Sequence, residues 1–160
     1  MRLTLNIFAL LCCLCAAAPA AAQSRSLQFV TAIPDEPVGK RTLVIERRVG
    51  KGSEAEPEKF IVIDYEGFVF DSTAPDRKGR KFDSSKDRGA PLSVLLGVGR
   101  MVEGLDKGIQ GMKVGGTRTL VIPPNMGFGG TRTAFGEVPP NSVLLFEVEL
   151  LDVVQQQNVR

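Results

Sequence analysis

The stretch LLGVGRMVEGLDKGIQGMKVGGTRTLVIPP, residues 95–124, shapes the expectation for the whole chain. Four of its apolar residues are spaced by three, four and three positions, which is the spacing of one helical face: Val102, Leu105, Ile109 and Met112. We therefore expect a short helix over residues 101–112. The glycines inside it each cost about 1 kcal/mol relative to alanine, so packing against a sheet has to hold the helix. TRTLVI, residues 117–122, reads as a strand that Pro123 ends.

Alternation of apolar and polar residues predicts strands on both sides of this stretch. In KFIVIDYEGFVF, residues 59–70, the side chains expected to face a core are Ile61, Ile63 and Tyr65. In VLLFEVELLDVV, residues 143–154, they are Leu144, Phe146, Val148 and Leu150. Further strands are expected at residues 41–50, 82–85 and 92–96. Five or six strands with one short helix predict an α+β fold in which an antiparallel sheet wraps around the helix.

Composition and charge exclude several classes of function. The chain of 160 residues is 43% hydrophobic and 24% charged, as an ordinary globular domain is. Its net charge of +2 argues against nucleic acid or another polyanion as a partner. The absence of histidine removes histidine-based activation of nucleophiles and most transition-metal sites. We therefore expect no metal and no cofactor.

The first 22 residues have the pattern of a secretory signal peptide. MRLTLNIFALLCCLCAAAPAAAQS, residues 1–24, carries a positive charge at Arg2, followed by an apolar run and then small residues. Ala20 and Ala22 therefore fit a cleavage site before Gln23. An uncleaved membrane anchor is the alternative, since the apolar run is nearly long enough to span a bilayer. Cleavage would leave a chain without cysteine, which suits an oxidising compartment. We expect export to the periplasm or secretion, with no membrane association after cleavage.

The remainder of the chain divides into three parts. Residues 23–40 contain prolines and no hydrophobic periodicity, which indicates an extended lead-in. Residues 41–154 form the folded domain, and residues 155–160 form a short tail. Within the domain, residues 71–80 read as a turn-rich loop, and residues 125–142 form a long glycine-rich loop of a kind that is uncommon unless it is functional.

The polar stretch GRKFDSSKDRG, residues 79–89, holds one aromatic ring, Phe82, for which a solvated loop has no use. The chain offers no metal-ligand spacing, no nucleophile elbow and no dinucleotide-binding glycine spacing. What remains is a set of large apolar residues at the edges of strands, helix and loops, which could enclose a cavity. From the pattern alone, the simpler interpretation that most of them belong to the core stays open.

Several motifs in combination resemble the FKBP-type peptidyl-prolyl cis-trans isomerases. They are KFDSSKDRGAP, the stretch quoted first, GFG and VPPNSVLLFEVELL, and the resemblance covers about residues 41–154. It implies a curved antiparallel sheet wrapped around one short helix, with a cleft between them that receives a prolyl ring. It also implies that the substrates are proline-containing polypeptides.

The resemblance assigns a pocket to ten residues of this sequence. Aromatic and aliphatic side chains would line it or stand beside it: Tyr65, Phe82, Met101, Val102, Leu105, Phe128, Val138 and Phe146. Asp83 would stand at the mouth near a substrate carbonyl, and Arg88 would hold Asp83. The backbone N–H of Val102 would donate to a carbonyl of the bound peptide.

The chain departs from the family pattern in two parts of the pocket. Leu105 stands where the family usually has a tryptophan floor, and Phe128 stands where a tyrosine hydroxyl usually reaches the ligand. Phe135 could supply a rim aromatic instead. The lost ring contact is worth about 1–3 kcal/mol and the lost hydrogen bond about 1 kcal/mol. We therefore expect isomerase activity, which could be lower than that of typical family members, and weak binding of tacrolimus or rapamycin.

Two functions remain in view at this stage. The first is a peptidyl-prolyl cis-trans isomerase that accelerates X–Pro isomerisation during the folding of exported proteins. The second is a binding or chaperone module that has the same fold and weak or no isomerase activity. Asp83 and Arg88 favour the isomerase, whereas Leu105 and Phe128 favour the module. The lead-in is shorter than a long dimerisation helix would need, so we expect a monomer.

Overall fold

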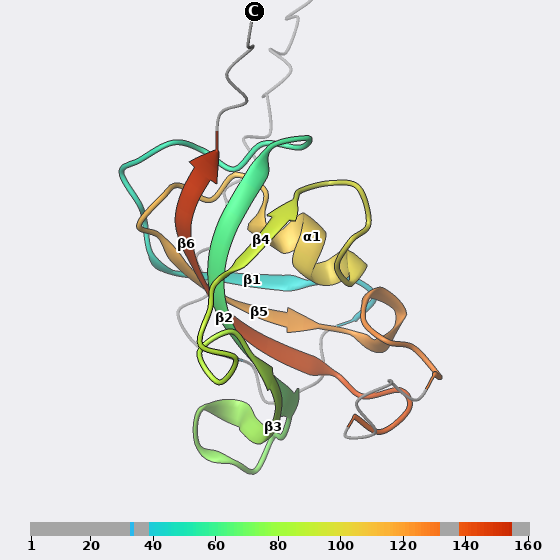
Figure 1. Cartoon of the computed structure of the whole chain (residues 1–160). Coiled ribbons are helices and arrows are strands. Elements are labelled where there is room, and N and C mark those ends of the chain that lie inside the picture. The colour runs from blue at the N-terminus through green and yellow to red at the C-terminus, as the bar shows by residue number, and fades with distance from the viewer. Residues whose placement is uncertain (1–32, 34–38, 132–137, 155–160) are drawn as a thin grey trace, which may run out of the picture.

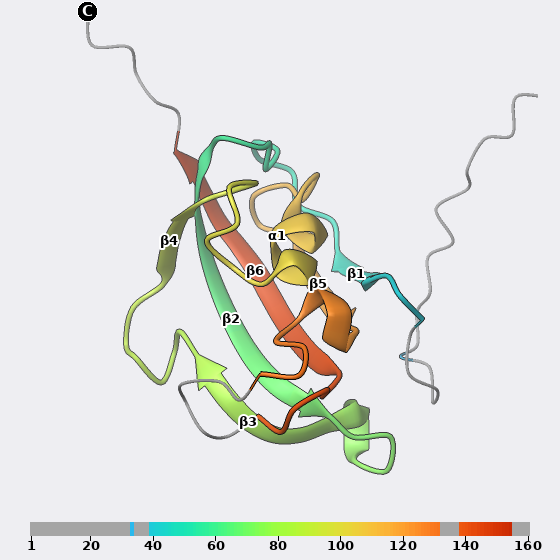
Figure 2. The same ribbon diagram turned by 90° about the vertical axis from the view of Figure 1, so that its right-hand side faces the viewer.

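The chain folds around one antiparallel sheet. The computed structural model describes residues 33, 39–131 and 138–154. The strands of the sheet are β1 (Leu43–Arg48), β2 (Phe60–Phe70), β3 (Lys78–Ser84), β4 (Leu92–Leu95), β5 (Thr117–Ile122) and β6 (Leu144–Val154). In the described part of the chain there is one α-helix, α1 (Glu103–Ile109), and it lies on the concave side of the sheet (Figures 1 and 2). The predicted α+β fold is confirmed.

The two longest strands form the middle of the sheet. Its order is β1-β5-β6-β2-β3, and β4 pairs with β2 off this path. One edge of β2 pairs with β6, whereas its other edge is divided: Phe60–Ile63 pairs with β4, and Glu66–Phe70 pairs with β3. The turn between β3 and β4 therefore lies beside the centre of β2. This arrangement brings the residues that follow Phe82 next to Tyr65.

The glycines of α1 have a packing role that offsets their low helix propensity. A β-carbon added at Gly104 would lie 2.4 Å from Cγ2 of Ile122, and one added at Gly108 would lie 2.6 Å from Cδ1 of Leu120. Both contacts are shorter than van der Waals packing permits. Glycine at these two positions therefore lets the helix approach β5 closely.

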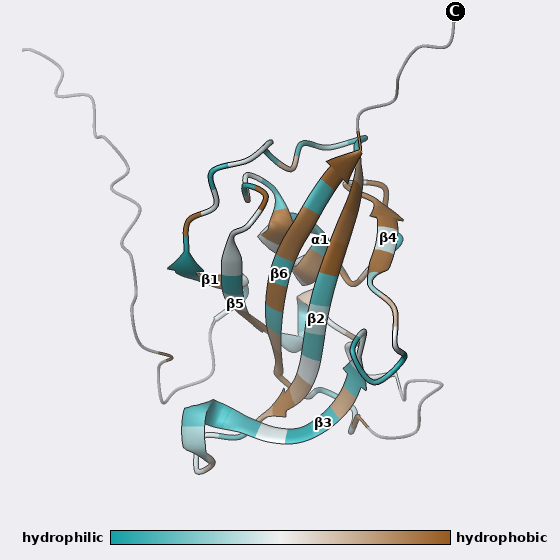
Figure 3. Cartoon of the chain, turned by 60° about the vertical axis from the view of Figure 1, so that its left-hand side comes forward, coloured by the Kyte–Doolittle hydropathy of each residue, from teal (hydrophilic) through white to brown (hydrophobic). Residues whose placement is uncertain are grey.

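The core lies between α1 and the inner face of the sheet. On β2 the predicted core side chains, Ile61, Ile63 and Tyr65, are all buried. The same holds for the four residues predicted on β6, Leu144, Phe146, Val148 and Leu150. Apolar and polar residues alternate along both strands in Figure 3. The period-2 prediction of which faces are buried is thus confirmed.

The boundaries of several elements differ from the sequence prediction. The helix is shorter than the expected 101–112, because the backbones of Val102 and Gln110 take extended ψ values of 141° and 137°. β3 begins at Lys78, inside the expected loop 71–80, because a short 3₁₀ turn, Pro75–Arg77, returns the chain early to pair with Phe70. A second 3₁₀ turn, Pro124–Met126, was not predicted. Among the helices of the described residues, none is long and apolar enough to cross a membrane.

Candidate active site

An apolar cavity of about 410 Å³ opens between α1 and the sheet. Eight of the ten predicted site residues line it: Tyr65, Phe82, Asp83, Met101, Val102, Leu105, Phe128 and Phe146. They come from β2, β3, the segment before α1, α1 itself, the loop after β5, and β6. Residues far apart in the sequence thus form one enclosure, which is large enough for a prolyl ring and its neighbours.

Aromatic rings build one wall of the cavity. The ring of Phe82 packs edge-on against Phe146 at 5.6 Å and against Phe128 at 5.9 Å between centroids. Gly67 makes this packing possible, because a β-carbon there would lie 2.8 Å from Phe82 and 2.9 Å from Phe146. Leu105, 4% exposed, lines the cavity from α1.

A polar cluster of Tyr65, Asp83 and Arg88 stands at one edge of this wall. The Tyr65 hydroxyl donates to Oδ2 of Asp83 at 2.7 Å, and Nη1 of Arg88 donates to Oδ1 of the same carboxylate at 2.7 Å. Nη2 of Arg88 also donates to the Tyr65 hydroxyl, and the guanidinium lies over the Tyr65 ring. Each member therefore contacts both of the others, which fixes the direction in which the carboxylate points.

The environment of the cluster favours a protonated Tyr65 and a charged Arg88. Burial raises the pKa of the Tyr65 hydroxyl, and its hydrogen bond to Asp83 raises that pKa further, while Arg88 opposes the shift. The hydrogen bond between Arg88 and Tyr65 raises the pKa of Arg88 above its usual range. At neutral pH the tyrosine therefore acts as a hydrogen-bond donor to the carboxylate.

Ser85 ties the start of the turn between β3 and β4, which carries Arg88, to the backbone of Tyr65 on β2. Its hydroxyl is fully buried, accepts the backbone N–H of Tyr65 at 3.0 Å and donates to Oδ1 of Asp64 at 2.7 Å. Its own backbone N–H donates to the carbonyl of Tyr65 at 3.0 Å. The strand expected at residues 82–85 included Ser85, whereas β3 ends at Ser84. Two adjacent serines after an apolar-polar strand were the available signal for such an anchor.

Asp106 fixes the segment on the other side of the cavity. It is 7% exposed, and its carboxylate accepts the backbone N–H groups of Gly97 at 2.8 Å and Gly99 at 3.2 Å. The turn that leads to Met101 and Val102 is thus tied to α1. Among the described residues, none accepts a hydrogen bond from the backbone N–H of Val102, so this N–H is available to a ligand.

The remaining predicted site residues lie near the cavity without lining it. Arg88 donates hydrogen bonds to two residues of the lining, Asp83 and Tyr65. Val138, 3% exposed, belongs to the hydrophobic core and is not part of the lining. Phe135 lies outside the described residues.

Two lining residues were not among those predicted, Leu92 and Arg100. Leu92 belongs to the strand expected at residues 92–96 and to the large apolar residues that could enclose a cavity, but not to the ten residues assigned to the site. Arg100 directly precedes the predicted Met101, and its position was the only signal in the sequence.

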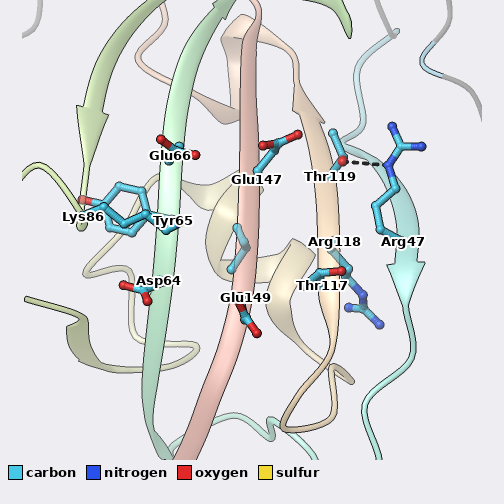
Figure 4. Close-up of a pocket in the computed structure, with 11 residues that line it drawn as sticks. Arg47, Asp64, Tyr65, Glu66, Lys86, Thr117, Arg118, Thr119, Glu147 and Glu149 are labelled. Carbon is cyan, nitrogen blue, oxygen red and sulfur yellow. Dashed lines mark hydrogen bonds between the residues drawn. The ribbon is translucent and has the colours of Figure 1, made fainter.

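A second hollow lies on the outer, convex face of the sheet (Figure 4). Its side chains are mostly polar and charged, and they include Asp64, Glu147 and Glu149. Glu147 pairs with Lys78 at 2.8 Å and Glu149 with Arg48 at 2.7 Å, while Asp64 accepts from Ser85. We interpret this surface as a solvated ladder of cross-strand pairs. Over residues 33, 39–131 and 138–154, no three His, Cys, Asp or Glu side chains group as a metal site would require.

Comparison with known proteins identifies the family of the chain. Residues 51–151 match the model of the FKBP-type peptidyl-prolyl cis-trans isomerases. The FK506-binding protein of Neisseria meningitidis serogroup A is 46% identical over 115 residues, which is 71% of this chain and 98% of that protein.

Two crystal structures share the fold. That of AtFKBP13 has a TM-score of 0.60 at 36% identity, and the match covers 71% of this chain and 93% of the other. That of FkpA from Escherichia coli has a TM-score of 0.63 at 33% identity, and the match covers 76% of this chain and 52% of the other. The chain therefore belongs to the FKBP-type peptidyl-prolyl cis-trans isomerases, and its activity is the cis-trans isomerisation of X–Pro bonds.

Proposed function

We propose that the cavity between α1 and the sheet is the place where this isomerisation occurs. The observation that supports the assignment is the combination of an apolar enclosure with one oriented carboxylate at its edge. Phe82 and Phe146 offer flat apolar surfaces to a prolyl ring. The orientation of the Asp83 carboxylate is fixed by three hydrogen-bond donors, which belong to Tyr65, Ser84 and Arg88.

The reaction suits a site of this composition. Rotation about an X–Pro bond crosses a barrier near 20 kcal/mol and takes tens to hundreds of seconds without a catalyst. The twisted transition state loses amide resonance, so its nitrogen no longer carries the partial positive charge that it has in either planar isomer. A dry cavity that binds the twisted form more tightly lowers the barrier, about tenfold for each 1.4 kcal/mol. Proton transfer and covalent intermediates are not needed.

The residues around the cavity would have different roles in binding and catalysis. The aromatic wall and Leu105 would hold the ring, and the backbone N–H of Val102 would donate to a carbonyl of the bound peptide. Asp83 would face the reacting amide, where a carboxylate interacts with the redistributed charge of the twisted bond. Arg88 and Tyr65 would keep Asp83 in place.

An isomerisation assay on Leu–Pro and Phe–Pro peptides, with and without rapamycin, tests the assignment. We expect acceleration by the wild-type chain and inhibition by rapamycin at higher concentrations than a tryptophan-floored relative requires. Acceleration that rapamycin leaves untouched at saturation would place catalysis outside this cavity.

We further propose that the chain is exported and acts on proteins that fold after export. The support is the signal-peptide pattern of residues 1–22 together with the absence of cysteine from residues 23–160. N-terminal sequencing of the protein recovered from its native compartment should begin at or near Gln23. Recovery of chains that start at Met1 in a membrane fraction would contradict cleavage.

The division into a lead-in, a domain at residues 41–154 and a tail, and the monomeric state, are proposals of the same kind. Limited proteolysis should leave a stable fragment close to residues 41–154. Light scattering on the mature chain should give the mass of one copy, and a mass of two copies would contradict the monomer.

A further inference from the structure

Arg100 lines the cavity, and no residue in the described part of the chain pairs with its side chain. It is exposed and precedes Met101 and Val102, which form part of the same lining. Among the described residues, none accepts a hydrogen bond from its guanidinium or lies within ion-pair distance of it. The turn that carries it is tied down, because Asp106 holds the backbone N–H groups of Gly97 and Gly99. Arg100 is thus a cation whose backbone is held in place and whose side chain has no partner among residues 33, 39–131 and 138–154.

In the described part of the chain, the acidic side chains in the cavity lining and on the segments beside it have partners. Asp83 accepts from Arg88 and Tyr65, and Glu103, three residues beyond Arg100, pairs with Lys107 at 2.6 Å. Asp106 binds backbone N–H groups, and Asp87 pairs with Lys81 at 2.6 Å. The charge of Arg100 is therefore uncompensated within the described part of the site. An apolar cavity beside it leaves that charge less screened than one on an open surface.

We propose that Arg100 is a specificity residue that favours substrates with an acidic side chain directly beside the proline. This inference rests on the proposed role of the cavity as the substrate site. A guanidinium binds a carboxylate through paired hydrogen bonds, which an ammonium or an amide cannot reproduce. The proline ring would occupy the apolar enclosure, and the neighbouring Glu or Asp would reach the guanidinium at the rim.

The test compares matched peptides that differ at one position. One set carries Glu, Gln or Lys before the proline, and a second set carries the same residues after it. Exchange spectroscopy by NMR gives the catalysed rate for each peptide without an auxiliary protease. The proteins are wild type, Arg100→Gln, Arg100→Glu and the control Lys51→Gln. The control removes an exposed positive charge that does not line the cavity.

We expect kcat/KM of the wild type to be about two- to fivefold higher for a Glu peptide than for its Gln counterpart in at least one set. Arg100→Gln should remove this ratio, Arg100→Glu should invert it in favour of Lys, and Lys51→Gln should retain it. High salt should reduce the ratio, because the pair is partly exposed.

Failure of this inference can be told apart from failure of the cavity assignment. Equal rates for Glu and Gln peptides in both sets, or a ratio that survives Arg100→Gln, would overturn the role of Arg100 alone. If the wild type accelerates none of the peptides, the assignment of the cavity and the role of Arg100 both fall.

Discussion

The hydroxyl of Tyr65 donates a hydrogen bond of 2.7 Å to the carboxylate of Asp83, across the paired strands β2 and β3. The same carboxylate accepts from Nη1 of Arg88 at 2.7 Å and from the backbone N–H of Ser84 at 2.9 Å. Three donors therefore orient Asp83 before any substrate arrives. Such preorganisation avoids a reordering cost during the reaction, and it makes the cluster a suitable place to test the proposed mechanism.

Replacement of Asp83 by alanine should reduce catalysis while the domain stays folded. A hydrogen bond or charge interaction of about 1–3 kcal/mol in the transition state corresponds to a loss of roughly 5- to 150-fold in kcat/KM. The rate on a Leu–Pro peptide measures the loss, and circular dichroism checks the fold. Asp87→Ala is the matched control, because Asp87 lies in the turn that follows β3 and pairs with Lys81 outside the cavity. An unchanged rate in folded Asp83→Ala would remove Asp83 from the mechanism.

Replacement of Ser85 by alanine should weaken both the fold and the site. The change leaves the backbone N–H of Tyr65 without its buried acceptor, which costs about 1–3 kcal/mol in the free energy of unfolding. Urea denaturation measures this cost, and the peptide assay should show a lower kcat/KM because Tyr65, which bonds to Asp83, loses a hydrogen bond that holds its backbone. Ser93→Ala, at an exposed position of β4, should leave the unfolding free energy nearly unchanged. Equal stabilities for the two variants would contradict an anchoring role for Ser85.

Tyr65 should titrate at a higher pH in the folded chain than in the unfolded chain. It is the only tyrosine and the chain has no tryptophan, so the tyrosinate absorbance reports this residue alone. Burial first, and the bond to Asp83 second, raise its pKa above the ordinary value of 10.0. Because the folded state binds this proton more tightly than the unfolded state does, the protonated hydroxyl contributes to the free energy of unfolding. The contribution is complete at pH values below the unfolded-state pKa, and it is lost as the pH rises through the folded-state pKa.

The midpoint in native buffer should therefore lie above the midpoint in concentrated urea, and the unfolding free energy should fall above about pH 10. Asp83→Asn removes the second cause, so its midpoint should lie between the two. A native midpoint at or below the denatured one would show that the hydroxyl is not held as the geometry indicates.

The buried faces of β2 and β6 could be predicted because apolar and polar residues alternate along both strands, and only one face of each strand is then apolar throughout. The helix was predicted too long, since the spacing of Val102 and Met112 continues past backbone that is extended at Val102 and Gln110. Spacing reports which side chains face the core and does not report local ψ angles.

The site could be predicted only in part. The motif resemblance supplied Asp83 and Phe82. Ser85 bonds to Asp64, 21 positions away, and Asp106 bonds to backbone N–H groups nine and seven positions before it, and the sequence pattern does not identify these partners. Arg100 was not predicted, because its proposed role depends on which acidic side chains near it are already paired, and the sequence does not show this.

Replacement of Leu105 by tryptophan should tighten the binding of tacrolimus. Leu105 projects from α1 into the cavity, and a larger ring at that position would add apolar contact worth about 1–3 kcal/mol, or roughly 5- to 150-fold in Kd. The variant would carry the only tryptophan of the chain, so its fluorescence should report binding directly. Leu95→Trp is the control, because Leu95 lies on β4 outside the lining and its fluorescence should not respond.

Phe128→Tyr should add a smaller increment to this gain. Phe128 lines the cavity and packs edge-on against Phe82, so a hydroxyl on its ring could reach a ligand carbonyl and contribute about 1 kcal/mol. The two gains need not add, because both side chains would contact one ligand. Calorimetric titration of tacrolimus into the wild type, both single variants and the double variant measures the increments. A Leu105→Trp variant that folds normally yet binds tacrolimus less tightly and isomerises more slowly would show that Leu105 does not form the floor of the binding site.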